Sequence, residues 1–496
     1  MKYYVGIDIG TSGTKSVAFD NKGCICSSKS YEYDIIAPQP GYAEENPLDW
    51  KKGVLETLRE ISLELGGDSI VGIGLSGQMH GLVMLDSDNN ILDNSIIWCD
   101  NRCEAEALLL DEFGREKIRA ITGNYPMQAF TLSKLLWVKR NKPAIYKKIA
   151  RIMLPKDYIR FILTGEFKTE PSDASGMQMM DIKNKTWSKE LLSYFDIDER
   201  ILPKIVESGD ITGYVCDEVK SYTGLRNTFV VGGAGDQAAC AIGNGVLGSQ
   251  NASISLGSSG VIFKPLDDLS NMNPNMQYFC HAIKGIYHTM AVTNGCGNSL
   301  KWYKNLLCQK EILEAKNEDI YSYITKNISQ VPAGTNGLIF LPYIMGERTP
   351  HLDPNATGLF IGLRGNTTKD EMTRAVIEGI SYSLKDCFQY MDGINRIIIS
   401  GGGAKNDIWC NIIASMLGTS IFKINVSEAP ALGVAILAMV AGGEYSDVFE
   451  ATGNIISITK AYEPSLDDKT IYDKYFKIYQ KLYEKNKDIY RELKEI

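Results

Sequence analysis

The sequence lacks the features of several protein classes. No apolar run reaches the roughly 18 residues that a membrane-spanning helix needs, and the chain enters a predicted strand without a signal-peptide pattern. Lysine and arginine form no basic stripe, and the 496-residue chain has a net charge of -8, which argues against general nucleic-acid binding. We therefore expect a cytoplasmic protein that binds neither a membrane nor nucleic acid.

Histidine is scarce, with four residues, and the eleven cysteines include no Cys-x-x-Cys pair. Because their number is odd and their surroundings are apolar, the sequence predicts neither a zinc site nor a disulfide framework. Reduced thiols that act as small buried groups are the interpretation we favour. An anionic ligand would then need backbone amides, a lysine or a metal ion.

Short apolar runs alternate with helix-like stretches, which is typical of an α/β protein. Strands are predicted at 71–75, 83–85, 229–231, 339–341 and 397–399, and helices at 47–65 and 371–391. The last thirty residues predict a helix that docks through an aromatic stripe of Tyr472, Tyr475, Phe476, Tyr479 and Leu482.

One motif occurs twice, as DIGTSG at residues 8–13 and SLGSSG at residues 255–260, each time between two apolar runs. A single glycine turn between strands is more often structural than functional. Two copies of the same unit predict two domains of one fold, with a boundary in the glycine-rich stretch 243–250.

These turns are suited to phosphate, because glycines let backbone N–H groups approach an anion and hydroxyl groups add donors. The predicted phosphate-binding residues are Gly10, Thr11, Ser12, Gly13 and Lys15 in the first turn and Gly257, Ser258 and Ser259 in the second. Asp8 would repel a phosphate unless a cation lay between them, so the sequence predicts Mg²⁺ at Asp8.

A third glycine-rich element, IIISGGGAKNDIWCNIIA, lies at residues 397–414. Its strand enters the glycines, and a helix follows for which Asp407 could serve as the N-cap. The exposed backbone at Gly402 and Gly403 is a natural place for a nucleotide base and ribose.

The acceptor side is predicted in the first half of the chain. Asp236, in GGAGDQAACAIG, either caps the following helix or acts as a general base, and its position alone favours neither. His80 lies in the loop SGQMHGLV, where a sugar contact is reasonable although a lone histidine is more often structural. The segment IIWCDNR offers Trp98, Asp100 and Arg102, an aromatic face with hydrogen-bonding groups of the kind found in sugar pockets.

The sequence resembles the FGGY carbohydrate kinases over nearly its whole length. The resemblance is carried by ordered motifs that include GIDIGTSGTK, GYAEENPLDW, GIGLSGQMHGLVMLD, KLLWVKR, LPKDY, SDASG, GGAGDQAA, SLGSSG and GGGAKNDIW. It implies an α/β fold of two actin-like (ribonuclease H-like) domains flanking a catalytic cleft. Residues 1–246 would bind mostly the sugar, and residues 247–496, with the C-terminal helix, mostly MgATP.

The resemblance also implies roles for individual residues. Asp236 falls on the family's catalytic aspartate and Asp8 on its magnesium-linked aspartate, which makes both of them candidate catalytic and metal-binding residues. Gln78, Met79 and His80 fall on the sugar-binding loop. Positions similar to the family's adenine-nucleotide contacts are Gly297, Gly402 and Asn406. The chain departs from the family pattern at Ser258, where threonine is usual, and at Ala129, where related kinases usually have glycine.

The predicted reaction is transfer of the γ-phosphoryl group of ATP, with Mg²⁺, to the C5 hydroxyl of D-xylulose. The motifs QMHG and LPKDY resemble those of family members that act on this sugar. Alternatives within the family are ribulose or another ketose, gluconate, a polyol or glycerol. A rival of another class is a non-catalytic actin- or chaperone-like ATP-binding module or a sugar sensor. The resemblance would also allow a homodimer.

Overall fold

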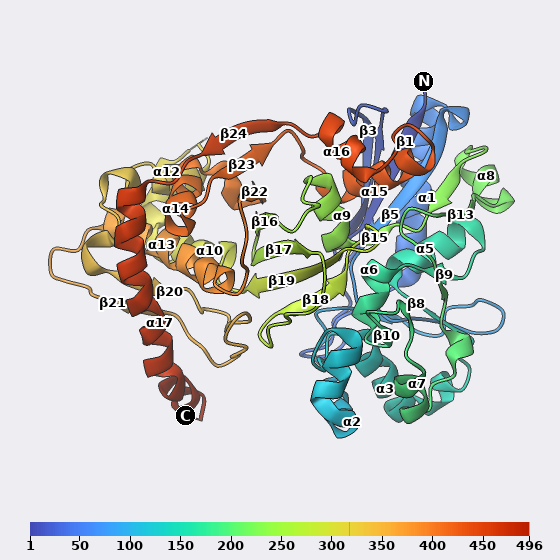
Figure 1. The fold of residues 1–496 in the computed structure, drawn as a ribbon, viewed down its shortest axis with the longest axis horizontal. Helices are drawn as coiled ribbons and strands as arrows, with labels where there is room; N and C mark the ends of the chain where they lie inside the picture. Colours follow the sequence, from blue (N-terminus) through green and yellow to red (C-terminus); the bar gives the residue numbers. More distant parts are fainter. Residues whose placement is uncertain (317, 496) are drawn as a thin grey trace. The chain divides into compact units, whose positions relative to one another are not determined.

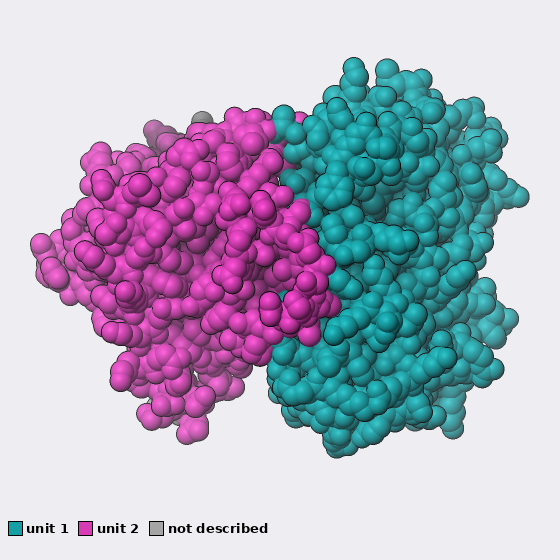
Figure 2. Space-filling view, viewed as in Figure 1, with its two compact units in different colours: residues 1–247, 278–288, 426–457 teal, residues 248–277, 289–425, 458–496 magenta. Residues whose placement is uncertain are grey.

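The computed structural model describes residues 1–316 and 318–495 and divides into two compact units (Figures 1 and 2). The first unit comprises Met1–Leu247, Tyr278–His288 and Val426–Ser457, and the second comprises Gly248–Gln277, Thr289–Asn425 and the chain from Ile458 onward. The first change of unit, after Leu247, lies within the glycine-rich stretch 243–250. Two later segments, Tyr278–His288 and Val426–Ser457, also belong to the first unit. The compact units are therefore not the product of one cut in the chain, and the predicted domain boundary at 246/247 stays a prediction.

The first unit is built on a mixed sheet whose strands follow the order β13-β14-β5-β1-β2-β3, with β15 also paired to β5. These strands are β1 (Tyr3–Ile9), β2 (Gly13–Phe19), β3 (Ile25–Glu32), β5 (Ile70–Gly77), β13 (Ile211–Tyr214), β14 (Phe229–Val231) and β15 (Ala234–Gly235). β1 runs parallel to β5 and antiparallel to β2. Its helices include α1 (Pro47–Leu65), α2 (Glu104–Thr122), α3 (Thr131–Asn141), α5 (Pro155–Thr164), α6 (Pro171–Ala174), α8 (Asp217–Thr223), α9 (Asp236–Gly243), α15 (Ala429–Ala441) and α16 (Val448–Ile455).

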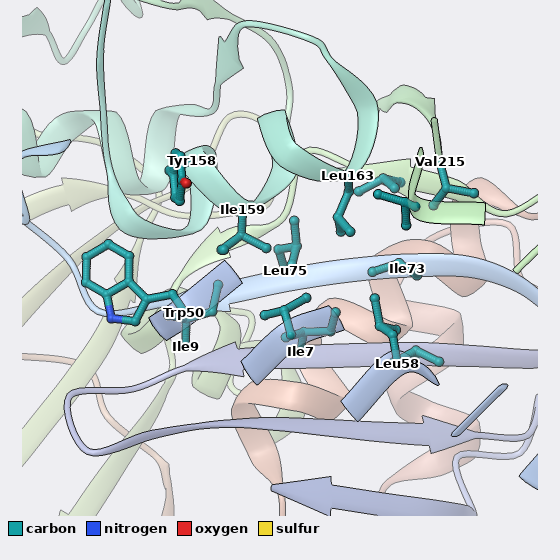
Figure 3. Packing of buried hydrophobic residues seen from close by; sticks show 14 of the residues in the cluster. Ile7, Ile9, Trp50, Leu58, Ile73, Leu75, Tyr158, Ile159, Leu163 and Val215 are labelled. Atoms are coloured by element: carbon teal, nitrogen blue, oxygen red, sulfur yellow. The ribbon is translucent and has the colours of Figure 1, made fainter. Parts of the chain in front are cut away.

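One face of this sheet forms an apolar core with α1 and α5, and Figure 3 shows the packing. Alternate residues of β1 and β5 point into it, as the two-residue period of a strand requires. Burying one such aliphatic side chain stabilises the fold by about 1.5–3 kcal/mol. The core includes Ile7, Ile9, Trp50, Leu58, Ile73, Leu75, Tyr158, Ile159, Leu163 and Val215.

The opposite face carries α15, which approaches the strands so closely that only glycine fits beneath it. A Cβ atom at Gly6 would lie 1.8 Å from the carbonyl oxygen of Ala431, and one at Gly74 would lie 2.0 Å from that of Val434. Strand alternation puts Asp8 on the same face as Gly6. The close approach of α15 therefore fixes the backbone of β1 next to the residue that the sequence singled out.

The second unit contains the β17-β16-β22-β23-β24 part of a related sheet, whose full order is β18-β19-β17-β16-β22-β23-β24. Its strands are β16 (Asn251–Leu256), β17 (Gly260–Leu266), β18 (Gln277–Cys280), β19 (Tyr287–Thr293), β22 (Arg396–Ser400), β23 (Ile421–Ile424) and β24 (Ile458–Tyr462). Its helices include α10 (Gly297–Leu307), α11 (Gln309–Glu314), α12 (Ile320–Thr325), α13 (Lys369–Phe388), α14 (Asp407–Leu417) and α17 (Leu466–Glu495). The antiparallel pair β16–β17 flanks the second glycine turn as β1–β2 flanks the first, which is the repeated unit that the two motifs predicted.

Most predicted elements are confirmed. The helix at 47–65 and the strands at 83–85, 229–231 and 339–341 have the predicted bounds. The terminal helix is α17, with its predicted last residue, Ile496, outside the described residues. Its fully buried ring positions are Tyr472 and Tyr479, joined by Tyr483 and Tyr490. Tyr475, Phe476 and Leu482 are only partly buried, so the docking stripe runs along a different line from the predicted one.

The N-cap of α14 was wrongly predicted to be Asp407. Asn406 is the cap, because its side chain accepts a hydrogen bond from the backbone N–H of Trp409. Asp407 instead contacts Lys423 and Lys460. The eleven cysteines are free thiols, and six of them are buried as predicted, whereas Cys24 is exposed and four others are only partly buried. Among the described residues, no helix is both long and apolar enough to cross a membrane.

Candidate active site

Asp8 lies near the end of β1, before the first glycine turn. The strand ladder pairs it with Ser76 on β5 and with Lys15 on β2. The hydroxyl of Ser76 donates a hydrogen bond of 2.8 Å to Oδ1 of Asp8. Burial nevertheless raises the pKa of Asp8, and the negative charge of Glu428 adds to this effect. Asp8 is thus a carboxylate held in surroundings that disfavour its charge.

Asp236 is the first residue of α9 and directly follows β15, which pairs with Ser76 and Gly77 of β5. Its Oδ1 accepts a 2.8 Å hydrogen bond from the backbone N–H of Gln237. Burial and the negative charge of Asp8 raise the pKa of Asp236 from 3.8 to about 7. The ladder β1–β5–β15 therefore brings two carboxylates from distant parts of the sequence into electrostatic contact.

The Asp8–Asp236 pair fits a hydrated divalent cation. Two repelling carboxylates supply oxygen donors, and Mg²⁺ is commonly bound by one or two carboxylates while it keeps several waters. A cation between them would offset the repulsion that raises the pKa of Asp236. Among the described residues, no group of three or more His, Cys, Asp or Glu side chains could hold a metal ion.

The first glycine turn is held by contacts that its sequence does not reveal. Gly10 donates its N–H to the carbonyl of Gly13, and the Tyr33 hydroxyl donates to the carbonyl of Gly10 at 2.7 Å. The indole N–H of Trp98 donates to Oγ1 of Thr11 at 3.0 Å. Trp98 thus contacts the predicted phosphate turn, and its predicted sugar contact stays a prediction.

Lys15 already has an anionic partner. Its Nζ lies 2.5 Å from Oε1 of Glu428, which directly precedes α15, and both side chains are partly exposed. A phosphate in the first turn would have to share Lys15 with this carboxylate. The expected neutralisation of phosphate by Lys15 therefore remains a prediction.

His80 has a left-handed backbone with a φ of 70°, which is uncommon for a residue with a side chain. Its carbonyl accepts hydrogen bonds from Nζ of Lys134 at 2.7 Å and from Oγ1 of Thr131 at 3.2 Å. Lys134 is fully buried, which lowers its pKa to about 7. Two residues of α3 therefore hold the strained turn, and such strain is common at ligand sites.

The side chains of this loop lie against two other motifs. Nδ1 of His80 is 2.9 Å from the carbonyl oxygen of Gly176, in SDASG, so the ring donates from Nδ1 in its neutral form. A Cβ atom at Gly176 would lie 2.5 Å from that nitrogen, so the position is suited to glycine. Met79 is buried, and a Cβ at Gly235 would lie 3.1 Å from its Cγ. The loop therefore reaches the residue that precedes Asp236.

Gln78 faces the interior. Its Nε2 donates to Oε2 of Glu45 at 2.8 Å, and the indole N–H of Trp50 donates to the same oxygen at 2.7 Å. Burial raises the pKa of Glu45 to about 7 despite these two donors. Gln78 is 3% exposed, so its observed role is to join the loop to α1, and its sugar contact stays a prediction.

Asp100 and Arg102 form an interior ion pair. Nη2 of Arg102 lies 2.6 Å from Oδ2 of Asp100, and Nη1 lies 2.7 Å from Oε1 of Glu44. The guanidinium also lies over the ring of Tyr42, 3.8 Å from its centroid. Asp100 is fully buried and the Arg102 side chain nearly so, and their predicted place in a sugar pocket stays a prediction.

A separate pocket of about 400 Å³ lies within the second unit. It brings together six of the predicted nucleotide residues, namely Gly257, Ser258, Gly297, Gly402, Gly403 and Asn406. Nδ2 of Asn406 also donates to Oγ1 of Thr325 at 2.6 Å. Ser259 does not line the pocket. Residues that were scattered over 150 positions of sequence thus share one cavity wall.

Sequence reasoning missed several side chains of this pocket. They are Leu256, Asn298, Leu300, Lys301, Asp319, Tyr321, Ser322, Lys405 and Trp409. Asn298 and Lys301 follow Gly297 in the first turns of α10. Because Gly297 was a predicted nucleotide contact, its neighbours on the same helix could have been predicted as well. Asp319, Tyr321 and Ser322 come from the start of α12, where no motif marks them.

Family models match both halves of the chain. The N-terminal domain of the FGGY family of carbohydrate kinases matches residues 3–243, and its C-terminal domain matches residues 252–442. The chain belongs to the FGGY family of carbohydrate kinases and has its two-domain fold.

Individual kinases are similar to the chain over its whole length. The chain is 36% identical over 502 aligned residues to a xylulose kinase of Bacillus subtilis, with 100% of this chain and 99% of the relative covered. A ligand-bound xylulose kinase of Lactobacillus acidophilus superposes with a TM-score of 0.92 at 29% identity, covering 99% of this chain and 100% of that one. A gluconate kinase of the same organism gives 0.93 at 29% identity, with 99% of both chains covered.

The Asp8–Asp236 pair predicts a pH-dependent gain in stability for Asp236→Asn. Because the folded-state pKa of Asp236 is raised to about 7, the wild-type protein loses stability as pH rises from about 4 through about 7. In metal-free buffer, we expect Asp236→Asn to raise the melting temperature by several degrees at pH 8 and by much less at pH 5.

The matched control is Asp68→Asn, an exposed aspartate of the same unit. It should change the melting temperature little at either pH. An equal effect of Asp236→Asn at both pH values would contradict the assigned pKa.

Proposed function

We propose that the protein phosphorylates D-xylulose at its C5 hydroxyl, using ATP and Mg²⁺ to form D-xylulose 5-phosphate. The observation that carries the proposal is the full-length match to relatives named xylulose kinase, together with the loop QMHG beside Asp236. The proposal specifies the acceptor and the donor for a chain that belongs to a carbohydrate kinase family.

Asp236 is the proposed general base. A base works best when its pKa lies near the working pH, and in the metal-free protein burial and the charge of Asp8 raise the pKa of Asp236 to about 7. As the C5 oxygen attacks the γ-phosphorus, its proton passes to Asp236 and the bond to the ADP oxygen breaks. Phosphoryl transfer asks a protein mainly for positioning and for neutralisation of charge.

Asp8 and Asp236 are the residues that would hold Mg²⁺. When bound, the ion would neutralise charge on the transferring phosphoryl group. The backbone N–H groups of the first glycine turn and the hydroxyls of Thr11 and Ser12 would bind phosphate oxygens. Glu428 would limit the share of Lys15 in this neutralisation, since it already pairs with the lysine.

Met79 and His80 are the proposed sugar contacts. The Gly176 carbonyl orients the His80 ring, and Lys134 and Thr131 hold its strained backbone. Preorganisation of this kind lowers the entropy lost when a flexible polyol binds. The second-unit pocket, with Gly297, Gly402 and Asn406, is the proposed site of the adenine nucleotide.

Gluconate is the strongest alternative acceptor. A gluconate kinase superposes on this chain as well as a xylulose kinase does, with TM-scores of 0.93 and 0.92 at equal identity. Fold likeness therefore does not separate the two sugars, because specificity depends on a few pocket residues.

The direct test is a coupled assay of ADP release with D-xylulose, D-ribulose, D-gluconate and glycerol as acceptors. We expect kcat/KM to be highest for D-xylulose, and Asp236→Asn to lower kcat by about 10²–10⁴-fold. A higher kcat/KM for gluconate or glycerol would overturn the proposed acceptor. Near-normal turnover of Asp236→Asn would overturn the proposed base.

The nucleotide pocket predicts a selective effect of Gly402→Val. A Cβ atom at Gly402 meets no atom within 4 Å, so the larger side chain would enter the pocket without strain in the fold. We expect the KM for ATP to rise about 5- to 100-fold, with the KM for the sugar and the melting temperature nearly unchanged.

Gly365→Val is the matched control, since Gly365 also faces open space in the second unit but does not line the pocket. It should leave both KM values as they are. Equal KM values for ATP in the two variants would contradict the proposal that the nucleotide binds in this pocket.

A further inference from the structure

A cluster of ionisable side chains lies buried in the first unit and plays no part in the proposed chemistry. Nζ of Lys156 lies 2.8 Å from Asp157, 3.2 Å from Glu170 and 3.1 Å from Asp173. Arg160 lies 3.0 Å from Asp157, and all five side chains have no exposed surface. Burying so many charged groups is unfavourable unless they are closely paired. Such a cluster needs an explanation beyond stability.

The cluster contacts both ends of the loop that leads to Asp236. Arg160 donates from Nη1 to the carbonyl of Gly232 at 2.8 Å. At the other end, the N–H of Gly235 donates to Oγ of Ser172 at 3.1 Å. Gly235 is the residue directly before Asp236, so this second contact is one peptide away from the proposed base.

Ser172 is oriented by the cluster. Its hydroxyl donates to Oε1 of Glu170 at 2.9 Å, and the same oxygen lies 3.2 Å from Nζ of Lys156. A hydroxyl has one proton, so donation to Glu170 leaves a lone pair of Oγ to accept the N–H of Gly235. The chain Lys156–Glu170–Ser172–Gly235 thus runs without a break from buried charge to the backbone of Asp236.

The loop has little freedom on its other side. A Cβ atom at Gly235 would lie 3.1 Å from Cγ of Met79, in the proposed sugar loop. A Cβ at Gly233 would lie 2.2 Å from the carbonyl oxygen of Leu75. A shift of the Gly235 peptide would therefore move Asp236 relative to Met79 and β5.

We propose that Ser172, held by Glu170 and Lys156, is a positioning residue that fixes the peptide before Asp236 and so aims its carboxylate at the acceptor hydroxyl. The inference rests on the proposed role of Asp236 as the base. Misplacement by about 1 Å can lower the rate about 10²-fold, so one hydrogen bond to this peptide has a measurable effect.

The chain offers a matched pair of variants for the test. Ser208 also donates its hydroxyl to Glu170, to Oε2 at 2.7 Å, and is likewise buried. Its side chain has no hydrogen bond to Gly235. Ser172→Ala and Ser208→Ala therefore each remove one buried serine hydroxyl from the same carboxylate, but only the first removes the contact with the loop.

We expect both variants to lower the melting temperature by similar amounts. Ser172→Ala should in addition lower kcat about 10- to 100-fold with little change in the KM for sugar or ATP, whereas Ser208→Ala should keep kcat within about twofold. Equal kcat values for the two variants would overturn the positioning role. Should Ser172→Ala fail to fold, Ser172→Cys, whose slightly larger thiol fills the site but accepts hydrogen bonds weakly, should show the same selective loss of kcat.

The wild-type enzyme separates the two possible failures. Absence of turnover with every acceptor sugar would reject the proposed function. Wild-type turnover with kcat unaffected in both Ser172 variants would leave the kinase assignment in place and reject the positioning role alone.

Discussion

Burial of the Asp8 and Asp236 carboxylates, close enough for the charge of Asp8 to raise the pKa of Asp236, is the constraint that the surrounding contacts must meet. The two acids lie far apart in sequence, and the β1–β5–β15 ladder brings them within reach of each other's charge. Left alone, like charges in a buried place would separate or one would bind a proton. The surrounding contacts oppose separation, since Ser76 holds Asp8 while Gln237 and the Gly235 peptide hold Asp236. The outcome is a buried carboxyl group whose pKa lies near neutral pH in the metal-free protein, beside a second carboxylate with which it could hold a divalent cation.

This arrangement depends on segments that follow the first half of the chain. Helix α15, from near the C-terminal end, lies directly on Gly6 and Gly74. Glu428, at its start, pairs with Lys15 and raises the pKa of Asp8. The electrostatics of the first glycine turn are therefore set by a residue 413 positions away. In this fold, α15 completes both the packing of β1 and the charge balance beside Asp8.

Sequence patterns predicted those elements whose structure depends on neighbouring residues. Glycine turns between apolar runs identified both hairpins, and the helix-like stretch 47–65 has the bounds of α1. Contacts between distant residues were not predictable. No local pattern indicates that Trp98, a predicted sugar contact, donates a hydrogen bond to Thr11. Nor does any local pattern indicate that Arg102 forms ion pairs with both Asp100 and Glu44. Likewise, no spacing rule connects Ser172 with Gly235.

The most direct test of this account is the pKa of Asp236, measured by NMR with ¹³C-labelled aspartate in the metal-free protein and in Asp8→Asn. The coupling described here predicts a titration near pH 7 in the wild type and a clearly lower value once the charge of Asp8 is removed. A value close to the ordinary aspartate pKa of about 3.9 in both proteins would contradict it, because the two carboxylates would then not sense each other.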